Sequence, residues 1–268
     1  MLSLLVAGGT QVAMAIATWK RQSAEAMHGW LAAWAEFETL NALATYAFEH
    51  PENVYPELLP VLSPPVFDGV SVGHPLLSRE ACVANNIALD QATRFYLISG
   101  SNMAGKSTLL RAVGLNALLA YAGAPVRAAS LRLSSMEIGS SLALIDSLAE
   151  GKSKFMAEVA RLAAIVRLSE SGPVLFLIDE LFSGTNSNDR RAAAEAVLRA
   201  LMANGAIGAL STHDLALTDL AGDGSLGVNV HMASPDADDP LAFDYRLKDG
   251  VNRSSNALAI LRMMGLET

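Results

Sequence analysis

The sequence predicts an α/β fold in which a mostly parallel β-sheet is flanked by helices. From about residue 66 onward, apolar runs of strand length alternate with segments of helical periodicity. A glycine-rich loop at 100–107 joins one of these runs to a helix, and another run ends in carboxylates at 179 and 180. The chain has 268 residues, of which 51% are hydrophobic, so it can bury a large core.

The expected elements of this domain follow one another along the chain. Expected strands cover residues 94–99, 131–138, 174–179, 206–211, 226–232 and 241–247. Expected helices cover residues 106–121, 154–169, 189–204, 213–221 and 254–264. Strands that alternate with helices form parallel sheets covered on both faces, so we expect a ligand at the carboxyl ends of the strands.

A separate helical segment is expected before this domain. Apolar side chains recur at helical spacing between Met27 and Ala44. This spacing predicts one long amphipathic helix that ends before Pro51, and we interpret its apolar face as core packing. Five prolines between residues 51 and 65 predict a non-helical connector. The expected organisation is a short N-terminal helical appendage at 1–50, a connector at 51–65 and the main domain at 66–268.

Composition limits the partners of the chain. Its 19 basic and 27 acidic residues give a formal net charge of −8, which is no footprint for strong, non-specific nucleic-acid binding. A DNA partner would therefore need a local patch, another protein or a further segment. The one cysteine, Cys82, excludes an internal disulfide framework and suits the reducing cytoplasm. The simplest interpretation of Cys82 is a small, buried apolar side chain.

Residues 1–19 carry no charge and precede Lys20 and Arg21, so a membrane helix is one interpretation. Gly8 and Gly9 interrupt the apolar run, and a cleaved signal peptide would place positive charge before that run. We favour a helix that packs on the rest of the protein or on a part outside this chain. The expected location is cytoplasmic, with membrane association as the alternative.

Residues 100–107 fit the pattern G-x-x-x-x-G-K-[ST] of a phosphate-binding loop. Glycine at both ends lets the backbone curl and turn its N–H groups inward. In this pattern Lys106 neutralises the terminal phosphates, the Ser107 hydroxyl holds Mg²⁺, and the following helix points its N-terminus at the anion. The candidate nucleotide-binding residues are Gly100, Ser101, Asn102, Met103, Ala104, Gly105, Lys106, Ser107 and Thr108.

Asp179 and Glu180 follow five apolar residues that predict a central, doubly buried strand. The stability of such a strand does not explain two carboxylates at its end. Together with a phosphate-binding loop upstream, Asp179 is placed to hold Mg²⁺ through water. Glu180 is placed to orient or deprotonate an attacking water, so we predict a metal residue followed by a catalytic residue.

Two further polar positions border this site. His213 follows the strand at 206–211 and can hydrogen-bond the γ-phosphate or the attacking water, so we place it at the catalytic periphery. Ser153 precedes the helix at 154–169, and on the sequence alone it is a helix cap. A capped helix start beside Lys152 and Lys154 can also receive a phosphate.

The order of these motifs resembles the C-terminal ATPase domain of the MutS DNA mismatch-repair family. The resemblance covers roughly residues 66–266, and the helix at 23–50 is similar to the end of the lever helices that precede this domain. No segment resembles the family's mismatch-reading, connector or clamp domains, so the chain is similar to divergent MutS-related proteins or to a fragment of a longer one. The strings that carry the resemblance are GSNMAGKSTLLRAVGLNALLAYAGAPVRA, GKSKFMAE, VLFLIDELFSGTNSNDR, STHD and NVH, with GHPLL and VANNIAL as first strands and DYRLKDGVNRSSNALAILRMMGL as the end.

The resemblance implies an architecture like that of ABC-type ATPases, in which two domains face each other as a homodimer with ATP between them. It implies that Ser153 touches the γ-phosphate of the opposite subunit and that Val83 and His231 contact adenine. Cys82 stands where other members have an aromatic residue that stacks on adenine, so this chain departs from the pattern there.

The sequence thus predicts Mg²⁺-dependent binding and hydrolysis of ATP by a dimeric domain, in DNA repair or DNA-structure handling by resemblance. The alternative is a nucleotide-gated module for protein interaction or membrane association, with little turnover and no mismatch recognition. A transporter-type ATPase is disfavoured, because the chain has GKSKFMAE and no LSGGQ-like signature.

Overall fold

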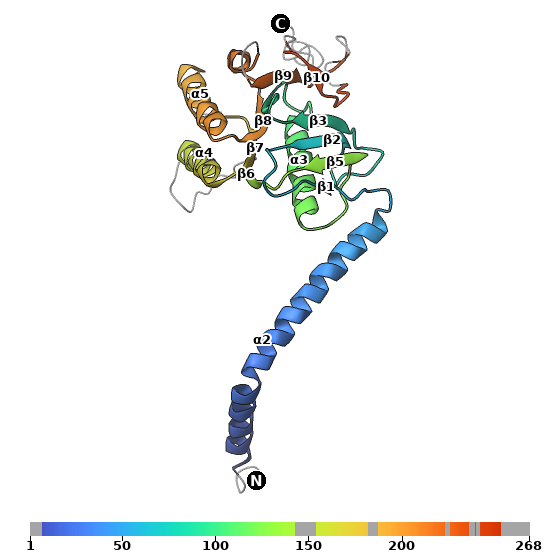
Figure 1. Ribbon diagram of the computed structural model, residues 1–268, viewed down its shortest axis with the longest axis vertical. Coiled ribbons are helices and arrows are strands. Elements are labelled where there is room, and N and C mark those ends of the chain that lie inside the picture. The colour runs from blue at the N-terminus through green and yellow to red at the C-terminus, as the bar shows by residue number, and fades with distance from the viewer. Residues whose placement is uncertain are drawn as a thin grey trace, which may run out of the picture. The chain divides into compact units, whose positions relative to one another are not determined.

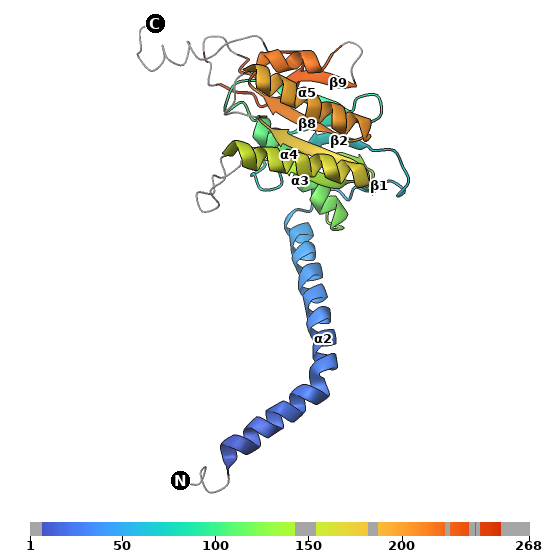
Figure 2. The same ribbon diagram turned by 90° about the vertical axis from the view of Figure 1, so that its left-hand side faces the viewer.

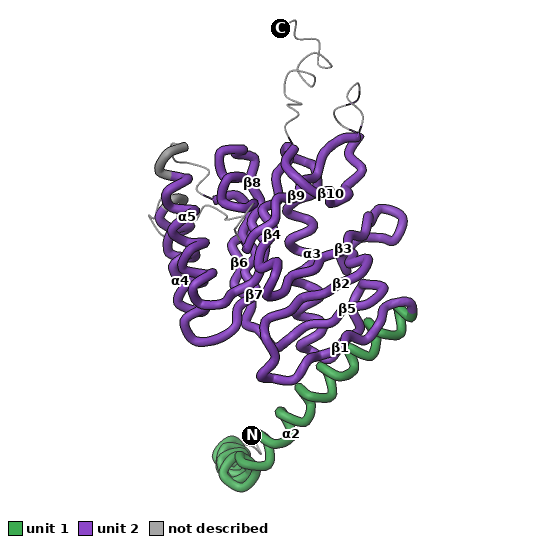
Figure 3. Tube along the Cα trace, turned by 45° about the horizontal axis from the view of Figure 1, so that its top comes forward, with its two compact units in different colours: residues 1–51 green, residues 52–268 purple. Residues whose placement is uncertain are grey.

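The computed structural model describes residues 7–142, 154–181, 187–222, 226–235, 239 and 242–252. The chain divides into two compact units, residues 1–51 and residues 52–268 (Figure 3). The first unit is helical, whereas the second contains two β-sheets and the remaining helices. The expected connector at 51–65 stays a prediction, and the short strand β1 (Glu57–Leu58) within it belongs to the second unit.

The first unit is the 42-residue helix α2 (Gly8–Glu49), which bends along its length (Figure 2). The expected long helix is confirmed, and it begins well before Met27. The helix taken by itself has no buried residue, and the interpretation of its apolar face as core packing stays a prediction. Among the described residues, no helix combines the length and the apolar character needed to cross a membrane.

The larger sheet of the second unit has the strand order β10–β9–β4–β8–β7–β6 (Figure 1). All neighbours pair in parallel except β10, which is antiparallel to β9. The strands are β4 (Phe95–Ser99), β6 (Glu137–Ser141), β7 (Val174–Asp179), β8 (Ile207–Thr212), β9 (Gly227–His231) and β10 (Lys248–Asp249). Four of the expected strands are therefore confirmed within one or two residues of their bounds, and the mixed α/β class is confirmed with them.

Helices cover both faces of this sheet. Strand β7 alternates between the two layers, since Leu175 and Leu177 pack with α3 (Lys106–Tyr121) while Phe176 and Ile178 pack in the other core. That second core includes side chains of α4 (Lys154–Ser171), α5 (Ser187–Ala203) and the 3₁₀ helix η2 (Leu215–Leu220). The expected helix at 254–264 lies outside the described residues.

A second sheet lies on the far side of α3, in the order β1–β5–β2–β3. It contains β2 (Phe67–Val72), β3 (Asn85–Leu89) and β5 (Ser130–Leu133), and its pairs are antiparallel except β1 with β5. The expectation of a mostly parallel sheet therefore holds for the larger sheet only. Helix α3 is enclosed between two sheets, which explains why Leu110 and Ala117 are fully buried.

Three predicted elements are wrong in detail. The expected strand at 131–138 is two strands in different sheets, because Ser134 turns out of β5 and exchanges hydrogen bonds with Val66. The segment at 241–247 contains no strand in its described part, since Tyr245 has a left-handed φ of 55°. The expected helix at 213–221 is the shorter 3₁₀ helix η2, whose N-cap is Asp214.

The string GHPLL is not a strand either. It follows β2 and forms a turn, in which the Leu76 N–H donates to Nδ1 of His74 at 3.2 Å. Pro75 has no N–H to offer a neighbouring strand. The string VANNIAL does contain a strand, β3.

Candidate functional site

The phosphate-binding loop, Asp179, Glu180, His213 and His231 lie at one edge of the larger sheet. Strand register pairs Ser99 with Thr212 and with His231, and pairs Asp179 with Ser211. Because β7, β8, β4 and β9 are parallel, their carboxyl ends share this edge, where parallel sheets bind ligands. The loop that follows β4 and the carboxylates that follow β7 are thus separated by one strand, β8.

The loop after β4 has a backbone that depends on glycine. Gly100 has φ of 149° and Gly105 has φ of 101°, both in the region that L side chains rarely adopt. A Cβ atom at Gly100 would clash with the carbonyl oxygen of Met232, which follows β9. Gly105 is also the N-cap of α3, so the first N–H groups of that helix have no capping side chain at this position.

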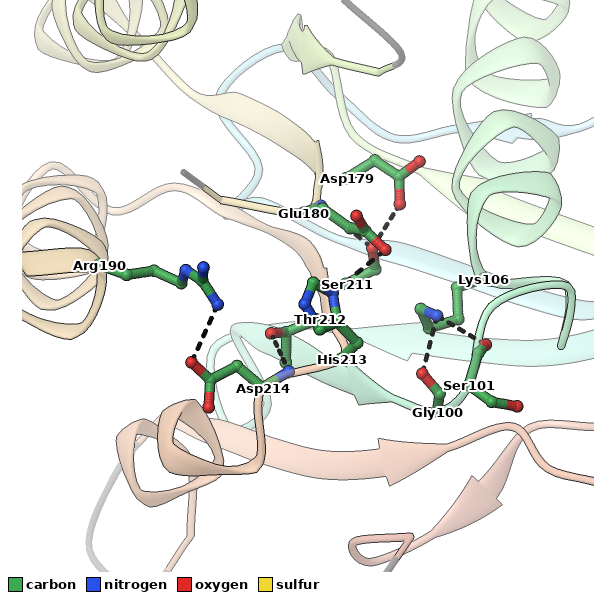
Figure 4. A network of polar contacts seen from close by, with 10 residues as sticks. All are labelled: Gly100, Ser101, Lys106, Asp179, Glu180, Arg190, Ser211, Thr212, His213 and Asp214. Carbon is green, nitrogen blue, oxygen red and sulfur yellow. Dashed lines mark hydrogen bonds and ion pairs between the residues drawn. The ribbon is translucent and has the colours of Figure 1, made fainter. Parts of the chain in front are cut away.

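Lys106 lies inside the loop rather than in solvent. Its side chain is 5% exposed, and its Nζ donates to the carbonyl oxygens of Gly100 and Ser101, each at 2.9 Å (Figure 4). Burial lowers the pKa of Lys106, while the negative charges of Glu180 and Asp179 act in the opposite direction. The ammonium is thus held at the loop, within electrostatic reach of both carboxylates.

The other loop residues differ in exposure. Asn102, Met103 and Thr108 are exposed, Ala104 is buried, and Ser107 is half-buried in the first turn of α3. The Ser101 hydroxyl is buried, and it neither donates nor accepts a hydrogen bond within the described chain. A buried polar atom without a partner is uncommon in native proteins, so Ser101 marks a place where a further polar group fits.

The carboxylates are fixed by the neighbouring strand β8. The Ser211 hydroxyl donates a short hydrogen bond to Oδ1 of Asp179, and the Glu180 N–H donates to the Ser211 carbonyl at 3.2 Å. Glu180 has φ of 54°, an uncommon conformation for a non-glycine residue. The Glu180 carboxylate lies beside His213, whose Nδ1 is 3.4 Å from Glu180 Oε1 (Figure 4).

A second ion pair supports the end of β8. Arg190 on α5 lies 3.1 Å from Oδ2 of Asp214, and both side chains are largely buried. Asp214 also caps η2 through the Ala216 N–H and donates its own N–H to the Thr212 hydroxyl. Contacts of Asp214 with α5, η2 and Thr212 therefore fix the segment that carries His213.

A cavity of about 250 Å³ lies beside the loop, between α3 and the segment that follows β2. Gly105, Thr108, Cys82 and Val83 line it, as do the rings of Tyr245 and His74. His231 is not among its lining residues, and its Nδ1 instead lies 3.1 Å from the carbonyl oxygen of Gly250. The structure thus brings Val83 to this cavity and leaves His231 at the end of β9.

Tyr245 was not predicted from the sequence. The buried Asn85 holds its segment, since Nδ2 donates to the Tyr245 carbonyl at 3.0 Å and Oδ1 accepts from the Leu247 N–H at 2.7 Å. Because Asn85 and Tyr245 are far apart in the sequence, no local pattern connects them. Ser211 and Arg190 were missed for the same reason, although the polar end of the 206–211 strand was a signal for Ser211.

Several residues at this edge have the chemistry that the predicted Mg²⁺ and nucleotide require. The described residues contain no group of three or more His, Cys, Asp or Glu side chains able to hold a metal by themselves. Ser107 and Asp179 offer two oxygen donors, which suits Mg²⁺, an ion that keeps several waters and binds substrate phosphates. A buried lysine at the loop and an adjoining cavity likewise fit a nucleotide. Ser153 lies outside the described residues.

The family model of MutS domain V matches residues 96–268, which is more than half of the chain. The match begins within β4 and includes the loop, the carboxylates after β7 and the end of β8. This family is associated with nucleotide-dependent ATPases and with DNA repair. The chain therefore belongs to the MutS family, through its C-terminal ATPase domain.

Proposed function

We propose that this chain binds ATP with Mg²⁺ and hydrolyses it as a MutS-type ATPase that acts as a dimer in DNA repair or DNA-structure handling. The observation that carries the proposal is the meeting of three groups at one sheet edge. These are the glycine-dependent loop, the buried Lys106, and the carboxylates Asp179 and Glu180, whose charges act on that lysine.

The loop residues bind and orient the phosphates in this proposal. The N–H groups of residues 100–105 and of the first turn of α3 donate to the phosphate oxygens. No side chain caps the start of α3, so its N-terminus is available to the anion. Lys106 donates to a phosphate oxygen in place of one of its two carbonyl partners. The negative charge of the phosphate offsets the unfavourable free energy of burying the ammonium group. The buried Ser101 hydroxyl, which has no hydrogen-bond partner among the described residues, then donates to a phosphate oxygen.

Ser107 and Asp179 are the residues that would hold Mg²⁺. When bound, the ion neutralises negative charge on the phosphate oxygens. The bond from the Ser211 hydroxyl fixes the Asp179 carboxylate toward this role, because it leaves the second oxygen of the carboxylate available.

Glu180 is the group that orients and deprotonates the attacking water. Glu180 follows the last residue of β7, and His213 is close enough to share a proton with its carboxylate. A carboxylate beside an imidazole can accept a proton from water and pass it on, so we assign His213 a supporting position at this base.

The cavity beside the loop is the proposed site of the base. Val83 contributes an apolar wall, and Tyr245 supplies an aromatic ring close to Gly105. An aromatic ring stacks on a purine irrespective of hydrogen bonding. Tyr245 therefore takes the role that Cys82 cannot, and His231, which the resemblance places at adenine, acts from outside the described cavity.

The dimeric form rests on the family alone, with Ser153 contributed in trans. Replacing Glu180 by Ala tests it, because a site that binds ATP but does not cleave it holds the dimer closed. We expect ATP to raise the assembled fraction of Glu180→Ala on gel filtration relative to the nucleotide-free protein. An elution unchanged by ATP contradicts the dimeric mechanism.

A second candidate function is a nucleotide-gated interaction module with little turnover. The exposed apolar face of α2 favours it, since such a face indicates a binding partner. Turnover measured against Lys106→Ala separates the two functions. Binding of matched, mismatched and branched DNA across a range of salt concentrations tests the DNA role, which the net charge of −8 does not favour.

A further inference from the structure

Two side-chain contacts join the same two segments at the site edge. Strand β7 leads to Glu180 and then toward α5, whereas β8 leads to His213 and Asp214. Oε1 of Glu180 lies 3.4 Å from Nδ1 of His213. Nη1 of Arg190, in the first turn of α5, lies 3.1 Å from Oδ2 of Asp214 (Figure 4). Two consecutive residues after β8 are therefore each held by a side chain from the segment that follows β7.

Packing does not fix the imidazole of His213. Its side chain is 47% exposed, and exposed side chains change rotamer readily. The 3.4 Å contact with Glu180 is longer than an ordinary N–H···O hydrogen bond, so it is too weak to hold the ring by itself. The place of the imidazole beside Glu180 therefore depends on the backbone that carries it.

Asp214 fixes that backbone. Its N–H donates to the buried Thr212 hydroxyl at 3.0 Å, and its Oδ1 accepts from the Ala216 N–H at 3.0 Å. Its second carboxylate oxygen, Oδ2, faces Arg190. Removal of the Arg190 charge would leave a largely buried carboxylate without this cationic partner, and solvation would then draw it toward water. A turn of Asp214 toward water also displaces His213, the residue before it in the chain.

A neighbouring ion pair separates this role from simple attachment of the helix. Arg191 on α5 lies 3.1 Å from Oδ2 of Asp219 in η2, so it also joins α5 to the segment after β8. The Arg191 and Asp219 side chains are 45% and 66% exposed, whereas those of Arg190 and Asp214 are 14% and 18% exposed. Burial of a charged pair carries a desolvation cost that an exposed pair avoids, and apolar side chains often stabilise such a place equally well. Attachment of α5 alone therefore does not explain the buried pair.

We propose that Arg190 is a positioning residue, which acts through Asp214 to hold the His213 imidazole beside Glu180. Arg190 itself contacts neither nucleotide nor water in this role. Its effect on turnover rests on the proposed ATPase function, whereas the placement of the imidazole is a property of the nucleotide-free chain. The two are therefore measured separately.

The placement is tested by nuclear magnetic resonance of the nucleotide-free protein with isotope-labelled histidine. The signal of the His213 ring is assigned by its loss in His213→Ala. Arg190→Met removes the charge while keeping most of the length of the side chain, and it should shift this signal. Arg191→Met is the matched control, because it removes the exposed ion pair of the next residue on α5, and it should leave the signal in place.

A second variant covers the case in which Arg190→Met does not fold. Asp214→Asn removes the charge from the other side of the pair but keeps an acceptor for the Ala216 N–H, so η2 keeps its cap. It should shift the His213 signal as Arg190→Met does. Circular dichroism shows whether each variant is folded.

The effect on turnover is tested by kcat and by equilibrium binding of ATP. Arg190→Met should lower kcat about tenfold, because displaced catalytic groups lose rate. The dissociation constant of ATP should stay within about twofold, since the loop and Lys106 are unchanged. When His213→Ala is already present, adding Arg190→Met should change kcat by less than about twofold, because the group that Arg190 positions is gone.

Two results would overturn the proposal. One is a His213 signal that stays in place in folded Arg190→Met or folded Asp214→Asn. The other is a fall in kcat on Arg190→Met that is as large with His213→Ala as without it, which would give Arg190 a role apart from His213. A wild type without turnover would instead overturn the proposed ATPase function, and the ring signal would still decide whether Arg190 places His213.

Discussion

The sheet edge after β4 and the helix α2 both depart from the usual link between residue type and burial, but in opposite directions. At the edge, charged side chains such as Lys106 and Arg190 are enclosed and each has a partner of the chain. In α2, large apolar side chains such as Trp30 and Trp34 are exposed. Burial therefore does not follow residue type alone, and each departure from the usual rule marks a place where a ligand or another protein is expected.

The largest effect is expected at the edge. Glu180→Gln removes the proposed base while keeping the size of the side chain, so turnover should fall by about 10²–10⁴-fold. ATP binding should remain, since the loop and Lys106 are unchanged. Steady-state phosphate release and equilibrium nucleotide binding measure the two properties separately.

Glu195→Ala is the matched control for this substitution. Glu195 lies on α5 in an exposed ion pair with Arg199, away from the sheet edge, so its loss should leave turnover unchanged. Equal turnover by Glu180→Gln and the wild type would remove Glu180 from the proposed mechanism.

A glycine substitution compares the packing of the two regions directly. Gly208 in β8 lies against Phe176 of β7, and a Cβ atom there would clash with the Phe176 carbonyl oxygen and ring. We expect Gly208→Ala to lower the free energy of unfolding by about 3 kcal/mol, as overpacking of a core does. Urea denaturation followed by circular dichroism measures the change, and an unchanged midpoint would show that the two strands are less closely packed than described.

The same substitution in α2 should have the opposite sign. Nothing lies within 4 Å of the Cβ position at Gly29, so an added methyl group meets no neighbour. Alanine favours the helix over glycine by about 1 kcal/mol, and Gly29→Ala should raise the thermal midpoint of the helix by circular dichroism. A loss of helix in this variant would reveal a close neighbour of Gly29.

The smallest expected effect is a dependence on pH in the cavity wall. Burial, followed by the charges of Arg111 and Arg127, lowers the pKa of His74 below its ordinary value of 6.5. As the pH falls through 6.5, the unfolded chain takes up a proton that folded His74 refuses, so stability is lost until the folded pKa is reached. His74→Gln should therefore lose less stability than the wild type between pH 7.5 and 5.5 in urea titrations. Parallel losses in both proteins would assign the effect elsewhere.

The local patterns of the chain predicted the edge well. The motif at 100–107 and the carboxylates after 174–179 are short-range signals, because strand, loop and helix follow directly in sequence. Their convergence at one edge follows from parallel pairing, which the alternation of strands and helices predicts.

The remaining features depend on contacts between distant segments. The small antiparallel sheet, the position of Tyr245 and the break after β5 are set by partners such as Asn85 and Val66 that no periodicity reveals. The helical spacing of α2 predicted its conformation, but an amphipathic pattern indicates a covered face without saying what covers it.

Equilibrium binding of ATP with Mg²⁺ to the purified 268-residue chain tests the central claim most directly, with Lys106→Ala measured alongside. If the loop, the buried lysine and the carboxylates form a nucleotide site, the wild type binds ATP saturably and Lys106→Ala loses that binding. Absence of binding by the wild type, or equal affinities of the two proteins, would contradict the account.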